Sequence, residues 1–272
     1  MNTNSNTYTV IYTATVVILV AAILAFVSQK LGPMQAANEK AETVSQILTA
    51  AQFGEPEHWQ EVGNAATLEF YTKNIEKAVL LDAEGNEAGE LNCAESEVYS
   101  TAQLKAQNYN IKDSAKADKV RIPVYIFNNG IKVIPIYGAG LWGPVWGYMA
   151  VEDDLKTIAG AYFDHASETP GLGGKIKDDP AFRAQFKGKA LDYEDAKPFN
   201  IIKGGAPEGK ANAVDAITGA TMTSRGLEGA VDQWLNAYAP YFQKEPAAEP
   251  EMLEEAPADS LAIEIMEEPS NE

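Results

Sequence analysis

The chain has 272 residues, of which 46% are apolar and 22% charged, a composition that excludes full disorder. Its 39 acidic residues outnumber the 21 basic ones, and the net charge of −18 argues against binding to nucleic acid through phosphate contacts. The single Cys93 excludes a disulfide framework, an all-cysteine zinc site and an iron–sulfur cluster held by this chain alone. The length predicts one or two domains.

The N-terminal segment, residues 1–30, is predicted to be a transmembrane anchor. Residues 8–27 form a stretch of the length that a helix needs to cross about 30 Å of hydrocarbon, and residues 16–27 are apolar throughout. A cleaved signal peptide is the alternative, but the segment before the apolar stretch has no Lys or Arg. Lys30 and Lys40 follow the span, and by the positive-inside rule they favour a cytoplasmic domain.

Residues 31–60 are predicted to be a stalk or the first helix of the domain. Pro33 is expected to open this helix, because apolar residues recur at helical spacing from Met34 to Ala51. Gly54 and Pro56 are expected to end it.

The body of the chain, residues 61–244, reads as an α+β domain. Residues 78–82 and 87–91 flank a turn and predict a hairpin, and strands are expected at 120–127, 132–137, 147–151 and 157–163. The short turns between the last four predict an antiparallel meander. A helix is predicted over residues 224–238, with Ser224 as its N-cap. We therefore expect a twisted antiparallel sheet packed by helices.

The C-terminal segment, residues 245–272, holds ten acidic residues, four prolines and no Lys or Arg. This composition predicts a disordered, solubilising tail. The alternative is a docking peptide anchored by its apolar residues between Leu261 and Met266.

The segment from Asp215 to Ser224 reads Asp-Ala-Ile-Thr-Gly-Ala-Thr-Met-Thr-Ser and leads into the predicted helix. Gly219 and Ala220 let the backbone approach a ligand closely, and a helix start favours a phosphate. A plain capping loop rich in Ser and Thr is the simpler alternative. Likewise, His165 with Glu168 could be a sparse metal pair, although an ordinary polar loop is the more common explanation.

The string Asp-x-x-Thr-Gly-Ala-Thr at residues 215–221 resembles the acceptor sequence of FMN-binding domains that carry covalent flavin. Two further segments, Gly-Leu-Trp-Gly at 140–143 and Glu-Thr-Pro-Gly-Leu-Gly at 168–173, resemble one branch of that family. This branch comprises the C subunits of the sodium-translocating NADH:quinone reductases, which also have one N-terminal span.

The resemblance implies a phosphoester between FMN and Thr221, with Thr223 as the second choice. It implies recognition by a flavin transferase at Asp215. The further residues expected to bind FMN are Trp142, Glu168, Thr169, Gly171, Leu172, Gly173, Thr218, Gly219, Ala220 and Thr223. Trp146 could be plain core, and Lys203 could either pair with the phosphate or lie on the surface.

The implied function is that of an electron carrier between other subunits of a membrane complex, with no general acid, base or nucleophile and no metal site of its own. The family places the domain outside the cytoplasm, in conflict with the lysine count, and we follow the family. One alternative is the equivalent subunit of a ferredoxin:NAD⁺ reductase complex, which shares the acceptor string. The other is a membrane-tethered binding domain without a cofactor.

Overall fold

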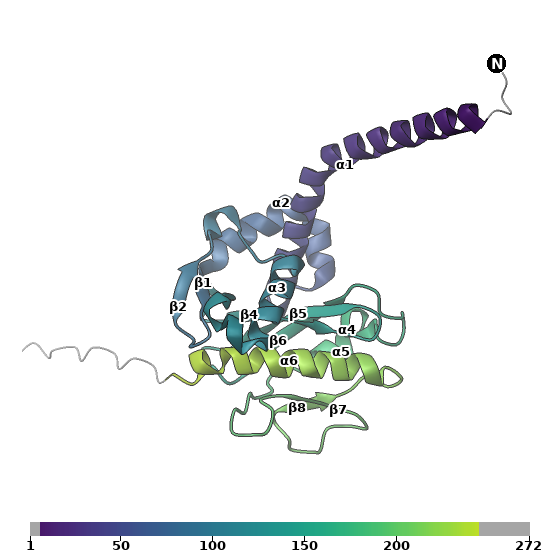
Figure 1. The fold of residues 1–272 in the computed structure, drawn as a ribbon. Coiled ribbons are helices and arrows are strands. Elements are labelled where there is room, and N and C mark those ends of the chain that lie inside the picture. Colours follow the sequence, from purple (N-terminus) through teal and green to yellow (C-terminus); the bar gives the residue numbers. More distant parts are fainter. Residues whose placement is uncertain (1–5, 245–272) are drawn as a thin grey trace, which may run out of the picture.

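The computed structural model describes residues 6–244, so the predicted acidic tail lies outside the described residues. Its centre is a six-stranded antiparallel sheet with strand order β2-β1-β3-β4-β5-β6 (Figure 1). The strands are β1 Ile75–Leu81, β2 Glu87–Glu90, β3 Ile122–Phe127, β4 Lys132–Ala139, β5 Pro144–Val151 and β6 Ile158–His165. The α+β class is confirmed, as are the hairpin and the meander.

Helices cover the sheet and join its strands. They are α1 Asn6–Ala50, α2 Pro56–Asn74, α3 Thr101–Lys112, α4 Lys175–Asp178, α5 Pro180–Ala184 and α6 Thr221–Phe242, with short 3₁₀ turns η1 Cys93–Glu95 and η2 Ser114–Lys119. A separate two-stranded parallel ribbon, β7 Asn200–Ile202 with β8 Ala213–Asp215, leads to the start of α6. Neither α2, α3 nor this ribbon was predicted from the sequence.

Helix α1 is continuous through Pro33, so the prediction that Pro33 opens a new helix is wrong. Its exposed first part is long and apolar enough to cross a membrane, by length and composition. Its last turns are buried, with Val44, Ile47 and Leu48 fully enclosed. Figure 1 shows the helix changing direction between these two parts. Pro33 provides the physical cause of a bend, because it removes one hydrogen bond of the helix ladder.

The two longest helices lie on opposite faces of the sheet (Figure 1). On β4, Gly138 faces α6, because a Cβ atom there would lie 2.5 Å from the Cβ of Ala230. Trp146 on β5 faces α1, where its Nε1 donates to Gln46 Oε1 over 3.3 Å. Gly138 pairs with Val145, the neighbour of Trp146, and neighbours along a strand point to opposite faces. The sheet therefore separates the membrane helix from the helix that begins at the predicted acceptor loop.

Candidate functional site

Glu168 joins three segments that are far apart in the sequence. It lies just after β6 and is only 4% exposed. Its Oε1 accepts a hydrogen bond from the backbone N–H of Trp142 (2.9 Å), and its Oε2 accepts one from the hydroxyl of Thr223 (2.6 Å). The Gly-Leu-Trp-Gly segment, the Glu-Thr-Pro-Gly-Leu-Gly loop and the first turn of α6 thus meet at one carboxylate.

Glycines allow these three segments to approach the Glu168 carboxylate closely. A Cβ atom at Gly140 would overlap Glu168 Oε1, and one at Gly173 would lie 2.5 Å from Glu168 Oε2. Gly219 has a φ of +83°, and a Cβ atom there would lie 3.0 Å from Leu172 Cδ2. The predicted acceptor loop therefore packs directly on Leu172, in a backbone conformation that favours glycine.

Helix α6 begins at Thr221, three residues before the predicted start, and no side chain caps it. Ser224 is therefore not the N-cap: it lies in the first turn, where its hydroxyl accepts a hydrogen bond from the N–H of Ile217 (3.1 Å). The first N–H groups of a helix without a side-chain cap form a site with a positive potential that suits a phosphate. Such a site lies next to the partly exposed Thr221.

The two candidate acceptor threonines differ in accessibility. Thr223 is 1% exposed and its hydroxyl is already bonded to Glu168. Thr221 is partly exposed, at the first position of α6. The geometry therefore favours Thr221 over Thr223 as a point of attachment.

Large apolar side chains surround this helix start while remaining exposed to solvent. Trp142 is 67% exposed, and Leu141, Leu172 and Met222 are also exposed. Exposed apolar side chains gathered on neighbouring loops indicate a binding surface. A flat aromatic ring system resting on Trp142 and Leu172 would bury this surface. The exposed apolar surface suits the ring system of FMN, and the start of α6 suits its phosphate.

The remaining predicted residues lie around this centre in different roles. The backbone oxygen of Thr169 accepts the N–H groups of Leu172 (3.1 Å) and Gly174 (3.0 Å), which shapes the loop, and Gly171 there has a φ of +74°. Thr218 is exposed, and Ala220 is buried directly before α6.

Asp215 ends β8 and supports a neighbouring loop. Its Oδ1 accepts the N–H of Ala206 over 2.7 Å, and its own N–H donates to Gln185 Oε1 over 2.9 Å. Lys203 is exposed and follows Ile202, the residue paired with Asp215. The structure thus places both residues at one end of the β7–β8 ribbon, and Asp215 leads into the predicted acceptor loop. Trp146, in contrast, lies on the opposite face of the sheet from α6.

The contacts that support the Glu168 loop were not predicted from the sequence, which offered His165 only as half of a sparse metal pair with Glu168. His165 Nδ1 accepts the backbone N–H of Glu168 over 3.0 Å. The neighbouring Asp164 is buried, and its Oδ2 accepts from Gln46 Nε2 (3.0 Å) and from Lys177 Nζ (2.8 Å). No regular spacing connects Gln46 with Asp164, so the sequence held no signal for this contact. Within residues 6–244, no group of three or more His, Cys, Asp or Glu side chains could hold a metal ion.

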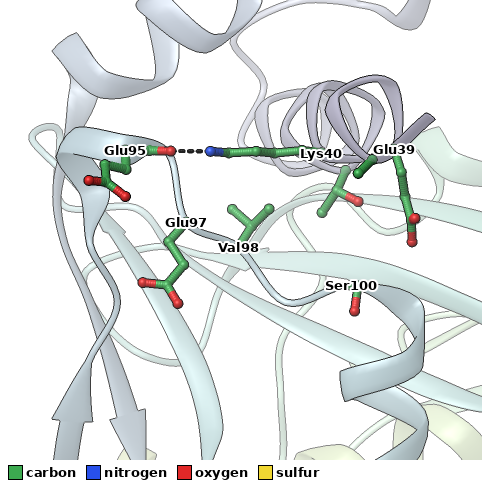
Figure 2. A pocket seen from close by; sticks show the side chains of 8 residues that line it. Glu39, Lys40, Glu95, Glu97, Val98 and Ser100 are labelled. Carbon is green, nitrogen blue, oxygen red and sulfur yellow. Dashed lines mark hydrogen bonds between the residues drawn. The ribbon is translucent and has the colours of Figure 1, made fainter. Parts of the chain in front are cut away.

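A separate cavity of about 390 Å³ lies between α1 and the segment that follows β2. Figure 2 shows Lys40 of α1 reaching the backbone oxygen of Glu95, with Glu39, Glu97 and Ser100 among the lining residues. The cavity contains none of the residues predicted to bind FMN, so it is distinct from the site at Glu168.

Comparison with known families and proteins agrees with this site. The FMN-binding domain family matches residues 140–236, a range that contains all three segments joined at Glu168. The C subunit of Na(+)-translocating NADH-quinone reductase from Vibrio parahaemolyticus is 37% identical over 193 residues, covering 65% of this chain and 73% of that protein. The equivalent protein of Vibrio campbellii is 41% identical over 149 residues, covering 50% of this chain and 57% of that protein.

Two solved structures share the fold. The C subunit of Na(+)-translocating NADH-quinone reductase from Parabacteroides distasonis has a TM-score of 0.65 and 29% identity, covering 79% of this chain and 98% of that one. NqrC of Shewanella oneidensis has a TM-score of 0.58 and 27% identity, covering 76% of this chain and 96% of that one. From these matches, the chain belongs to the family of the C subunits of Na(+)-translocating NADH-quinone reductase and contains an FMN-binding domain.

Proposed function

We propose that this chain holds FMN as a phosphoester on Thr221 and carries electrons within a membrane-bound sodium-translocating NADH:quinone oxidoreductase. One observation carries the proposal: Thr221 is a partly exposed hydroxyl at the uncapped start of α6, beside the exposed Trp142 and Leu172. The relatives, which are named as subunits of that reductase, support the assignment to this complex. Neither alternative, the ferredoxin-linked complex or the cofactor-free domain, gains support from these matches.

The residues present fit FMN, and each has a definable task. The first N–H groups of α6 face the position of a phosphate on Thr221, and Trp142 and Leu172 provide the apolar wall. Glu168 fixes the spacing of the three segments through its two oxygens. FMN itself, when bound, supplies the transfer of one or two electrons. The polypeptide binds and orients it, and we assign no acid, base or nucleophile to this chain.

The test is to produce the full chain together with a flavin transferase and to examine the denatured protein. We expect a fluorescent band whose mass exceeds that of the polypeptide by one FMN less one water. Thr221→Ala should abolish the fluorescence, because it removes the hydroxyl that forms the ester. The matched control is Thr101→Ala, which removes a partly exposed hydroxyl from the first position of α3, outside the predicted site, and should leave the label in place.

Two outcomes contradict the proposal. A dark wild-type band, obtained with a transferase shown to be active on another substrate, would rule out covalent flavin. A fluorescent Thr221→Ala band would show that FMN is attached to another residue, and Thr223 would be the next candidate. Asp215 remains our candidate for recognition by the transferase, and Asp215→Asn should slow labelling while Thr221 stays intact.

We further propose that the soluble domain lies on the outer side of the bacterial inner membrane, where it meets the other subunits and the transferase. Protease added to intact spheroplasts should then digest the domain, and a cytoplasmic marker protein should survive. If the protease digests the domain only after the membrane is broken, the domain lies on the cytoplasmic side. That is the orientation that the positive-inside rule predicts from Lys30 and Lys40.

A further inference from the structure

His165 is a polar group in contact with the Glu168 loop that the proposed function does not use. It is the last residue of β6 and is partly buried. Its Nδ1 lies 3.0 Å from the backbone nitrogen of Glu168, which donates the hydrogen bond. A backbone N–H cannot accept, so Nδ1 must carry a lone pair, and the ring proton of the neutral imidazole is on Nε2.

This hydrogen bond lies at the base of the turn that presents Glu168. Glu168 follows His165 by three positions, so the bond closes a tight turn between β6 and the loop. The carboxylate at the top of that turn holds the Trp142 N–H and the Thr223 hydroxyl. Because a Cβ atom at either Gly140 or Gly173 would overlap this carboxylate, there is little room for Glu168 to move while keeping both contacts.

Asp164 anchors the backbone of His165. Its Oδ1 accepts the N–H of His165 over 2.7 Å, and its Oδ2 accepts from Gln46 Nε2 and Lys177 Nζ. The imidazole therefore starts from a fixed point at the end of β6.

We propose that His165 is a positioning residue of this site: its Nδ1 accepts the Glu168 N–H and so aims the Glu168 carboxylate at Trp142 and Thr223. This inference deepens the proposed function, because the loop it holds is the one assigned to the flavin. The hydrogen bond itself does not depend on flavin, so the two proposals can fail separately.

The test is amide hydrogen exchange of the full chain in detergent, without flavin, in wild type, His165→Asn and His165→Phe. Asn places an acceptor oxygen at the same bond distance from Cα as Nδ1 and does not titrate, whereas Phe keeps a ring without an acceptor. At pH 7.5 we expect equal protection of the Glu168 and Trp142 amides in wild type and His165→Asn. In His165→Phe these amides should exchange up to about tenfold faster, the loss of one hydrogen bond.

Rescue by Asn is the readout that a merely structural role would not move, because Asn restores the acceptor but not the ring. Equal loss of protection in His165→Asn and His165→Phe at pH 7.5 would overturn the proposal.

A parallel labelling assay distinguishes this inference from the proposed function. With the transferase present at pH 7.5, His165→Asn should attach FMN as wild type does, and His165→Phe should attach it more slowly. If the exchange results are as expected but no variant carries the label, the positioning role of His165 is supported and covalent attachment of flavin is rejected. A normal label without the expected exchange pattern would reject the role of His165 alone.

Discussion

At Glu168, one carboxylate accepts two hydrogen bonds from separate segments while its surface is almost completely buried. Removing such an acceptor leaves buried donors without a partner, and the cost of an unpaired buried donor exceeds the net gain of an ordinary hydrogen bond. The consequences of a substitution therefore depend on whether the new side chain still offers an acceptor to both donors.

We predict that Glu168→Ala lowers the free energy of unfolding by about 3 kcal/mol, because the Trp142 N–H and the Thr223 hydroxyl both lose their acceptor. Glu168→Gln should lose less than half as much, since its amide oxygen can still accept from Trp142. Urea denaturation measures both values. If both variants lose the same free energy of unfolding, these two hydrogen bonds are not the source of the stability that Glu168 provides.

Asp195 provides a pH-dependent contact in the long connection between α5 and β7. Hydrogen bonds from Asn212 and Lys210 hold the pKa of its carboxyl at about 2, below the ordinary value. A carboxyl whose pKa is lowered on folding stabilises the protein above its unfolded pKa, and this contribution is lost as the pH falls through its folded pKa of about 2. We predict that Asp195→Asn destabilises the chain at pH 7 and that this effect becomes much smaller towards pH 2, measured by denaturant midpoints. A difference that stayed constant with pH would contradict this.

At the scale of elements, α6 and β4 pack closely because small residues face each other. A Cβ atom at Gly226 would overlap the backbone oxygen of Ala139, and Gly138 faces Ala230 in the same way. Helix α6 carries Thr221 at its start and buries Trp234 and Leu235 further along. This packing therefore fixes the distance between Thr221, the proposed acceptor, and the sheet.

Two glycines of α6 give a matched test of that packing. Gly226→Ala should destabilise the protein by about 2 kcal/mol, because the methyl group has no space against Ala139. Gly229→Ala should stabilise it by about 0.5–1 kcal/mol, because no atom lies within 4 Å and Ala favours helix. Thermal unfolding of both variants measures the difference. Stabilisation by both substitutions would show that helix propensity alone, and not contact with β4, governs the site.

The elements that were predicted correctly are those with a local signal. The hairpin and the meander have turn residues between apolar runs, and each appears in the structure close to its expected bounds. Helix α3 buries only Leu104 and Asn108, so its apolar periodicity was too weak to predict a helix. Its capping box, Ser100 with Gln103, was a readable signal that we missed. Helix α2 is interrupted by Gly63, which has a non-helical backbone, and this breaks its pattern.

At the scale of the whole molecule, α1 belongs to two environments. Its first part is exposed and apolar, whereas Val44, Ile47 and Leu48 in its last turns belong to the core of the domain. Each fully buried aliphatic side chain contributes about 1.5–3 kcal/mol. The membrane segment and the folded domain are therefore joined by one helix, and the boundary between them falls inside it.

We predict that a chain lacking residues 1–38 folds and stays in solution without detergent, because the buried part of α1 begins at Ala41. A chain lacking residues 1–52 should not fold, because it loses Val44, Ile47 and Leu48 from the core. Circular dichroism and gel filtration of the two products measure this. A folded product from the shorter chain would mean that α1 only lies on the domain and does not complete it.

The sequence by itself determined the apolar span, the α+β class and the three segments that resemble a flavin site, because composition, turn residues and short motifs are local properties. It could not determine that Trp142, Glu168 and Thr223 meet, nor that β1 pairs with β3 across α3, since both depend on contacts between distant parts of the chain. The tertiary structure alone decided that Thr223 is enclosed while Thr221 remains accessible. The physical reason is that burial depends on what packs against a side chain, and no local pattern specifies it.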